Sequence, residues 1–247
     1  FSPSLDFSIV DSKEYLTRIP LSNNLAWGKP NVYRPDYYNI LNNVNICDYV
    51  NNQGVRQVWL WGYHTDPSQS AASSPYTEPS ESNMAMGTSS SAYWNHGSYG
   101  DVSNSEQIDD MPICQKTYTL YNYNYGRGLG EMIHNHGHQV EWLLNWVEGR
   151  EVYGMDPPAN GIFWTKFVGS DVSHKIINPG CGWVHIPSNA QNDNDWSNDN
   201  VVLSDCKDWK PDGTGTKGPI SCNNWGCSGD TQTKFIVWWM QNIPGKN

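Results

Sequence analysis

The chain has 247 residues and an acidic balance, with 15 Lys and Arg against 25 Asp and Glu and a formal net charge of −10. Nucleic-acid binding needs clustered basic side chains that displace counterions from phosphates, so we expect no nucleic-acid partner. No run of roughly 18 apolar residues occurs, and we expect no membrane span. The length suits one large domain, so we expect residues 1–247 to form a single domain.

The six cysteines predict disulfide bonds and an oxidising compartment. Four of them follow position 180, in Gly-, Asn- and Trp-rich sequence that is typical of loops, and no two have the Cys-x2-Cys spacing of a zinc knuckle. We expect Cys47 to pair with Cys114, and Cys222 to pair with Cys227 or Cys206. Because the chain also does not begin with Met, we expect a processed, secreted protein.

The first half of the chain predicts helices near its start and two strands. Residues 12–18 favour a short helix, and apolar spacing over 35–50 favours an amphipathic helix, or a helix followed by a short extended piece. The β-branched and aromatic run at 55–61 predicts a buried strand. Residues 65–112 are rich in Ser, Pro and Gly and predict a long loop or lid. Residues 117–121 alternate like a strand.

The second half predicts one long helix followed by disulfide-bonded loops. A helix is expected from the histidine-rich segment at 130 to about 148, and a short apolar segment covers 162–167. Residues 178–230 form a Cys-, Asn- and Asp-rich loop region, and 235–240 predict a buried strand or a short helix. Together these elements indicate an α/β or α+β fold with a mixed sheet, one long histidine-bearing helix and extensive disulfide-bonded loops.

The histidine-rich segment divides its side chains between two faces of the predicted helix. Three of the seven histidines fall at 134, 136 and 138. At about 100° per residue, His136 lies on the apolar face, where it is expected to be buried. The opposite, polar stripe contains Glu131, His134, His138 and Glu141. Because spacings of three and four bring side chains together on a helix, these four could meet one metal ion.

Two interpretations of this stripe are open. It is either an ordinary solvated helix face or a metal site in which His134, His138 and Glu141 are ligands, with His185 or His174 added from elsewhere. His134-x3-His138 has the spacing of the zinc-protease pair, but Asn135 stands where that family has its general base. Glu131, Glu141 and His185 are the candidate catalytic residues. His185 follows a Gly-rich turn at 180–182.

A second candidate site is a loop with oxygen side chains at alternate positions. Asp193, Asp195, Ser197 and Asp199 occupy positions 1, 3, 5 and 7, as in loops that wrap one calcium ion. Position 12 holds Ser204 rather than the usual bidentate Glu. The alternative is an Asn- and Asp-rich turn without an ion. Asp193, Asp195 and Asp199 are therefore the candidate calcium ligands.

These patterns predict a secreted, metal-dependent hydrolase. A divalent transition metal such as zinc would activate water, and the substrate would be an extracellular polymer. The 13 Trp and 14 Tyr favour a glycan over a peptide, since aromatic rings stack on sugar faces. The alternatives are a non-enzymatic carbohydrate-binding protein with structural calcium, and a structural surface protein. No Gly-x-Ser-x-Gly, phosphate-binding or dinucleotide motif occurs, so serine hydrolase, kinase and dehydrogenase functions have no support.

Overall fold

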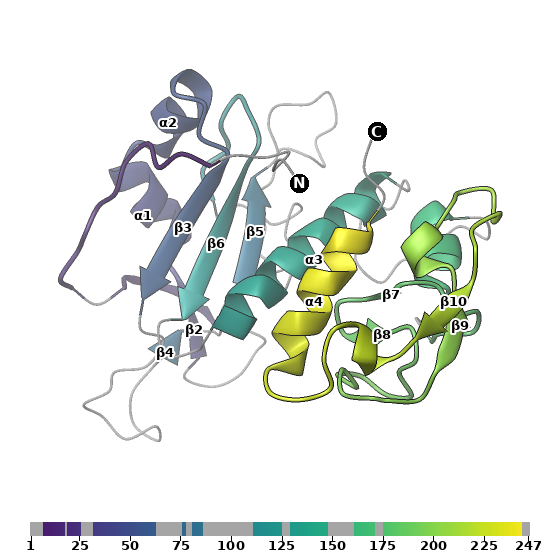
Figure 1. Cartoon of the computed structure of the whole chain (residues 1–247). Coiled ribbons are helices and arrows are strands. Elements are labelled where there is room, and N and C mark those ends of the chain that lie inside the picture. The colour runs from purple at the N-terminus through teal and green to yellow at the C-terminus, as the bar shows by residue number, and fades with distance from the viewer. Residues whose placement is uncertain are drawn as a thin grey trace. The chain divides into compact units, whose positions relative to one another are not determined.

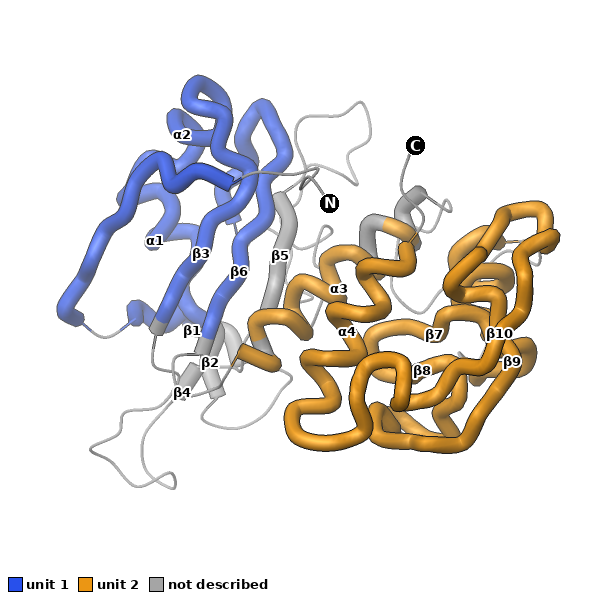
Figure 2. Tube along the Cα trace, in the orientation of Figure 1, with its two compact units in different colours: residues 1–126 blue, residues 127–247 orange. Residues whose placement is uncertain are grey.

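The computed structural model describes residues 7–17, 19–25, 32–62, 76–77, 81–85, 111–124, 129–147, 161–170 and 175–243. The fold is α+β, with helices and small sheets joined by irregular segments and disulfide bonds (Figure 1). The chain divides into two compact units, unit 1 at 1–126 and unit 2 at 127–247 (Figure 2). The expectation of a single domain is therefore not confirmed. None of the described helices has the length and hydropathy needed to cross a bilayer.

Two short helices stand in unit 1 where the sequence predicts one helical region. α1 (Tyr37–Asn43) begins after Asp36, whose carboxylate caps the first turn. α2 (Ile46–Asn52) begins after Asn45, which has a left-handed φ of 53°. Asn is the residue after Gly that best tolerates this conformation, so it lets the chain change direction between the two helices. The predicted region 35–50 is thus helical from 37 onwards, with a break at 44–45.

Unit 1 also contains two small sheets. The first has the order β1 (Leu21–Leu25), β2 (Val32–Pro35) and β4 (Tyr76–Thr77). The second has the order β3 (Gln57–Gly62), β6 (Tyr118–Asn124) and β5 (Glu81–Ala85). In the second sheet β6 pairs parallel with β3 and antiparallel with β5, so it is a mixed sheet.

The strand β3 is buried on one face only. Val58 and Leu60 pack against the core of unit 1, which includes Tyr37 of α1. Trp59 and Trp61 lie on the other face and are 47% and 50% exposed. The run at 55–61 predicts a buried strand; the structure has a strand there, but only one of its faces is covered, because the side chains alternate between the two faces.

Two other expectations for unit 1 change. Residues 81–85 form β5, so the region 65–112 is not entirely a loop. Most of that region lies outside the described residues, and a lid there stays a prediction. Residues 12–17 are irregular, and the helix expected at 12–18 is wrong for them. That segment is exposed, so no apolar face is buried that could stabilise a short helix.

Unit 2 is built around two helices that lie side by side (Figure 1). α3 (Leu129–Val147) carries the histidine-rich segment, and α4 (Thr231–Asn242) contains 235–240. Phe235, Ile236 and Trp239 are fully buried, which is the spacing of one helix face rather than of a strand.

Short elements fill the chain between α3 and α4. They are the π-helix η4 (Ile162–Val168), the hairpin of β7 (Gly182–Trp183) and β8 (Ile186–Pro187), the antiparallel pair β9 (Val202–Ser204) and β10 (Gly218–Ile220), and the 3-10 turns η5 (Cys206–Asp208) and η6 (Cys222–Asn224). The hairpin is tied to α4, because the Trp239 indole N–H donates to the carbonyl of Gly182 at 2.9 Å. Phe163, Trp164 and Trp183 pack in the same core.

Three disulfide bonds join the six cysteines. Cys47 pairs with Cys114 in unit 1, which confirms the expectation for these two. In unit 2, Cys222 pairs with Cys227, one of its two expected partners, and Cys181 pairs with Cys206. The sequence does not predict this last bond. It joins the residue before β7 to η5, so it fixes the start of the hairpin.

The two disulfide bonds of unit 2 are expected to contribute unequally to stability. Cys181–Cys206 spans 25 residues and Cys222–Cys227 spans 5. Loop-closure entropy then gives about 3.5 kcal/mol for the longer loop and about 2 kcal/mol for the shorter one. Paired Cys→Ala variants at each bond, unfolded in urea and followed by tryptophan fluorescence, measure both losses. Equal losses, or a larger loss for the shorter loop, would contradict the expectation.

Candidate metal centre

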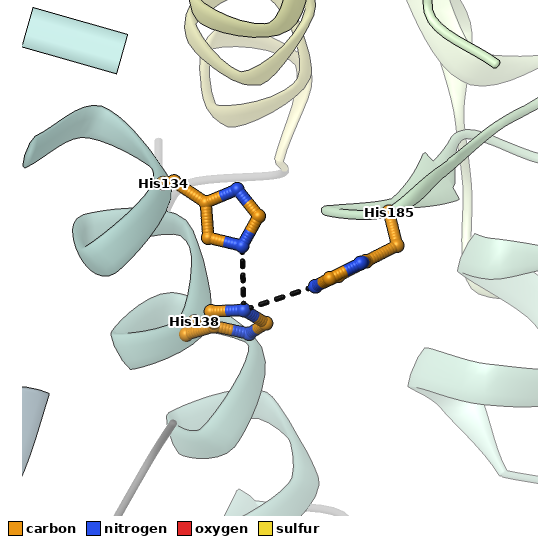
Figure 3. A group of neighbouring side chains, drawn as sticks. All are labelled: His134, His138 and His185. Carbon is orange, nitrogen blue, oxygen red and sulfur yellow. Dashed lines mark hydrogen bonds between the residues drawn. The ribbon is translucent and has the colours of Figure 1, made fainter. Parts of the chain in front are cut away.

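Three histidines of unit 2 converge on one point. His134 and His138 lie one turn apart on α3, and His185 comes from the turn between β7 and β8 (Figure 3). The Nε2 atom of His138 is 2.8 Å from Nε2 of His134 and 3.1 Å from Nε2 of His185. One ring nitrogen from each of the three lies within 4.8 Å of the others. Among the described residues, this is the one group of three or more His, Cys, Asp or Glu side chains placed to hold an ion.

The hairpin reaches α3 because the helix has a glycine between its histidines. A Cβ atom at Gly137 would lie 3.0 Å from Val184 Cγ2 and 3.1 Å from Ile236 Cγ2. Both neighbours are completely buried and have no room to withdraw. Val184 precedes His185 in the hairpin turn. The absence of a side chain at Gly137 therefore sets the distance between His185 and the two histidines of α3.

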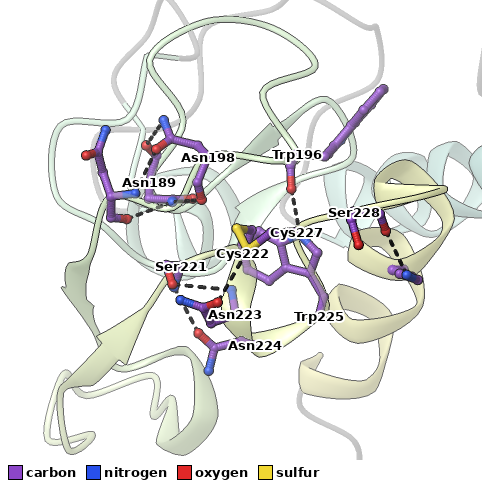
Figure 4. The surroundings of a disulfide bond; sticks show 12 residues. Asn189, Trp196, Asn198, Ser221, Cys222, Asn223, Asn224, Trp225, Cys227 and Ser228 are labelled. Carbon is purple, nitrogen blue, oxygen red and sulfur yellow. Dashed lines mark hydrogen bonds between the residues drawn. A yellow bond between two sulfur atoms is a disulfide. The ribbon is translucent and has the colours of Figure 1, made fainter.

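Two residues of the loop 191–200 hold the hairpin turn in place. The backbone N–H of Asn194 donates to the carbonyl of His185 at 2.7 Å. The Trp196 indole N–H donates to the carbonyl of Val184 at 3.1 Å. Trp196 is itself held, since its carbonyl accepts from the Trp225 indole at 2.7 Å, beside the Cys222–Cys227 bond (Figure 4). His185 is thus fixed by backbone contacts on both sides.

A buried carboxylate orients His138. Glu141, one turn further along α3, is 2% exposed, and its Oε2 lies 3.0 Å from Nδ1 of His138. A carboxylate that is ionised only accepts, so this contact selects the tautomer of His138 that carries the proton on Nδ1 and a lone pair on Nε2. The other oxygen, Oε1, is buried and has no hydrogen-bond partner among the described residues. A buried, half-satisfied negative charge is costly unless a positive charge lies close to it.

The other two imidazoles contact side-chain amides. Gln232 of α4 meets Nδ1 of His134, and the Asn194 side chain hydrogen-bonds the His185 ring. An amide offers a donor or an acceptor according to which way it is turned, so it can match either tautomer. Each of the three imidazoles therefore has an outer partner as well as its place in the group.

Hydrogen bonding alone does not account for the group. With Nδ1 protonated, Nε2 of His138 offers a single lone pair, yet two other Nε2 atoms approach it. One of the two neighbouring rings can donate an N–H to that lone pair in a linear hydrogen bond. The other ring then finds no lone pair on Nε2 of His138 for a linear hydrogen bond of its own. A cation among the three nitrogens would accept all three lone pairs at once.

Burial favours the neutral form of His185 and of His136. Burial lowers the pKa of His185 to about 4, and His138 adds to the shift, while Glu141 and Asn194 oppose it. Burial also lowers the pKa of His136, although this residue, which the helical pattern predicts to be buried, is partly exposed. Neutral imidazole is the form that binds metals.

The structure separates the predicted site residues. His134, His138 and His185 come together, whereas Glu141 lies behind His138 rather than at the convergence point. The polar stripe is not a solvated face, because His138 is 9% and Glu141 is 2% exposed. The Glu131 side chain and His174 lie outside the described residues, so the catalytic role of Glu131 stays a prediction.

The candidate calcium loop has ordinary turn contacts. The Asp195 carboxylate accepts from the backbone of Gln191 and from the side chain of Asn198. Asp193 and Asp199 are exposed. The three carboxylates do not form a group that could hold an ion within the described residues. Calcium binding there stays a prediction.

The sequence missed the roles of Gln232, Asn194 and Gly137. Amides are common in this chain, so nothing marks two of them as partners of histidines. A glycine inside a predicted helix is a signal, because it costs helix stability and therefore calls for a packing reason.

Comparison with protein-family models, with curated proteins and with solved structures gives no match.

Substitution of Gly137 by Ala is expected to weaken metal binding. The added methyl group would push Val184, and with it His185, away from α3, although Ala favours a helix by about 1 kcal/mol. We expect about a tenfold loss of zinc affinity, the size seen when a ligand loses its support. The matched control is Gly218→Ala, because a Cβ there meets no atom within 4 Å. Equal zinc affinities in the two variants would contradict this role for Gly137.

The metal-free protein is expected to lose stability as pH falls from about 6.5 to about 4. The folded state lowers the pKa of His185 from 6.5 to about 4, so the unfolded chain binds more protons in this range. The stability that the neutral His185 ring contributes is fully present above pH 6.5, and its loss amounts to about 3 kcal/mol.

Urea unfolding after chelation, repeated at several pH values, measures this dependence. The control is His185→Gln, which removes the titrating ring. Subtracting its profile isolates the contribution of His185 from those of the carboxylates. Parallel profiles for the two proteins would show that His185 does not titrate as expected.

Proposed function

We propose that unit 2 binds a divalent transition metal ion, zinc in the first instance, through Nε2 of His134, His138 and His185. The observation that carries the proposal is the approach of two imidazoles to the single lone pair of His138, at 2.8 and 3.1 Å. Imidazole nitrogen is a preferred ligand of zinc and of copper, nickel and iron. The unpartnered Oε1 of Glu141 supports the same conclusion, because a cation would compensate that buried charge across one ring.

The dimensions of the group fit such an ion. Zinc–nitrogen bonds of roughly 2.0–2.1 Å in a tetrahedron place ligand nitrogens roughly 3.3 Å apart. The contacts of His138 with His134 and His185, 2.8 and 3.1 Å, need only small ring movements to reach this spacing, and the ligand atoms of the third pair, His134 and His185, lie within 4.8 Å. The outer partners suit a ligand set, since metal-bound histidines donate their second N–H to carboxylate or carbonyl oxygens.

Three protein ligands leave one tetrahedral position for water, as in catalytic zinc sites. A bound divalent ion lowers the pKa of such a water towards 7 and so supplies a nucleophile. We therefore propose a metal-dependent hydrolase, with an extracellular polymer, a glycan in preference to a peptide, as its substrate. The three disulfide bonds support an extracellular location, and the abundance of Trp and Tyr supports the glycan.

The residues of the site then have distinct roles. His185 is a ligand rather than a general base, and Glu141 keeps the His138 ring in the ligating tautomer. The proton from water needs another acceptor. Glu131, one turn before His134 on α3, is the proposed general base.

Metal analysis of the purified protein and zinc titration after chelation test the site. We expect about one zinc per chain, and about a hundredfold loss of affinity in His138→Ala, which removes the central ligand. Glu141→Gln is expected to cost between about tenfold and a hundredfold, because it removes the carboxylate charge and puts in its place an amide that can turn either a donor or an acceptor to Nδ1 of His138. The matched control is His136→Ala, a histidine of the same helix that lies outside the group.

Two outcomes would contradict the proposal. Zinc affinity that is the same in His138→Ala, His136→Ala and the unaltered protein would place the metal elsewhere. A zinc-loaded protein that releases no products from neutral polysaccharides or from unfolded proteins would remove the hydrolase function and leave metal binding. The metal analysis also records calcium, and its presence would direct attention to residues 193–199.

A further inference from the structure

Trp196 is held rigidly beside the three histidines. Its indole N–H donates to the Val184 carbonyl at 3.1 Å, and its own carbonyl accepts from the Trp225 indole at 2.7 Å. In Figure 4 the Trp196 ring extends away from the Cys222–Cys227 bond, on the far side of its backbone from Trp225. Because both the backbone and the ring are fixed, a ligand that packs on this indole would lose little binding energy to ordering it.

The Trp196 ring also lies next to the proposed metal site. Its centroid is 6.5 Å from that of His134, and the two rings are perpendicular at 88°. Trp183 likewise flanks the group, 5.4 Å from His185, but it is only 6% exposed. Trp196 is partly exposed. Of these two tryptophans, Trp196 is therefore the more accessible one, although part of it packs against the core of unit 2.

The side chains around Trp196 have the chemistry of a sugar-binding surface. Exposed amides and carboxylates precede and follow it in the loop 191–200, including Asn192, Asp193, Asn194 and Asp199. Amides both donate and accept hydrogen bonds, and carboxylates accept them, which matches the hydroxyl groups of a sugar. The C–H face of a sugar ring is apolar and packs on an indole. The carboxylates would repel sulfated or acidic sugars, so the surface favours a neutral one.

We propose that Trp196 is the stacking platform for a sugar ring of a neutral glycan, next to the three-histidine site. The inference rests on the proposed function, since it names the substrate class of the same site. Trp196 would bind and place the glycan, while the histidines would hold the ion. Loss of Trp196 should therefore weaken glycan binding without removing the metal.

Calorimetric titration of the zinc-loaded full chain tests this directly. The probes are the linear hexasaccharides of glucose, N-acetylglucosamine, xylose and mannose. For at least one of them we expect binding by the unaltered protein and about a tenfold or larger loss in Trp196→Ala. Trp196→Phe should retain part of the binding because it keeps an aromatic face. Both variants lose the indole N–H that reaches the Val184 carbonyl beside His185, so any loss of zinc affinity should be the same in the two.

The matched control is Trp209→Ala. Trp209 is also a partly exposed tryptophan of unit 2, and its indole N–H also donates to a backbone carbonyl, that of Lys166. Its ring packs edge-on against Phe167 instead of a histidine. We expect this variant to bind the hexasaccharide as the unaltered protein does.

The outcomes separate this inference from the proposed function. If no hexasaccharide binds, or if Trp196→Ala binds as tightly as Trp209→Ala, the stacking role is wrong even when zinc binds. If the unaltered protein binds no zinc but binds a hexasaccharide through Trp196, the stacking role holds and the hydrolase function fails. Equal hexasaccharide binding by the zinc-loaded Trp196→Ala and Trp196→Phe variants would show that the aromatic face plays no part, and would overturn the role of Trp196 as a platform.

Discussion

A neutral imidazole has one proton for its two nitrogens. The arrangement of the three histidines in unit 2 depends on which nitrogen of His138 carries that proton. Glu141 fixes it on Nδ1 of His138, which leaves a single lone pair on the nitrogen where the other two rings meet. A carboxylate can do this only from within the protein, where water does not compete for its oxygens. The packing of α3 against α4 and the hairpin supplies that burial. The way Glu141 orients His138 therefore depends on the packing of the core of unit 2.

The tryptophans of unit 2 act mainly as hydrogen-bonding members of the core. Trp239, Trp225 and Trp196 each donate an indole N–H to a backbone carbonyl, and together they connect α4, the 191–200 loop and the β7–β8 hairpin. Composition alone suggests ligand binding as a use for so many aromatic rings. Among the described tryptophans of unit 2, Trp164, Trp183, Trp225 and Trp239 are buried, which narrows the search for a ligand surface there to the partly exposed Trp196, Trp209 and Trp238.

Local spacing in the sequence predicts part of the site, and distant packing decides the rest. His134 and His138 form a pair through their spacing on one helix, and His185 is one of two candidates for a third ligand. Gln232 lies 98 positions from its partner His134, and no local pattern reports such a contact. The fold, too, is predicted only where local patterns in the sequence are strong. The sequence predicts the disulfide bond of Cys47 with Cys114 and the mixed sheet, but the strand at 81–85 is hidden in weakly patterned sequence.

The disulfide bonds also bear on how the chain matures. Cys47 and Cys114 belong to unit 1, and the other four cysteines belong to unit 2, so every bond closes within one unit. Segregation of this kind leaves only a small fraction of the pairings that six cysteines would otherwise permit. During synthesis, Cys47 and Cys114 have both been made before the four cysteines of unit 2. Oxidation of this first pair therefore does not have to compete with oxidation of the other four. Mispaired intermediates should accordingly be confined to the four cysteines around the hairpin and the 222–227 loop.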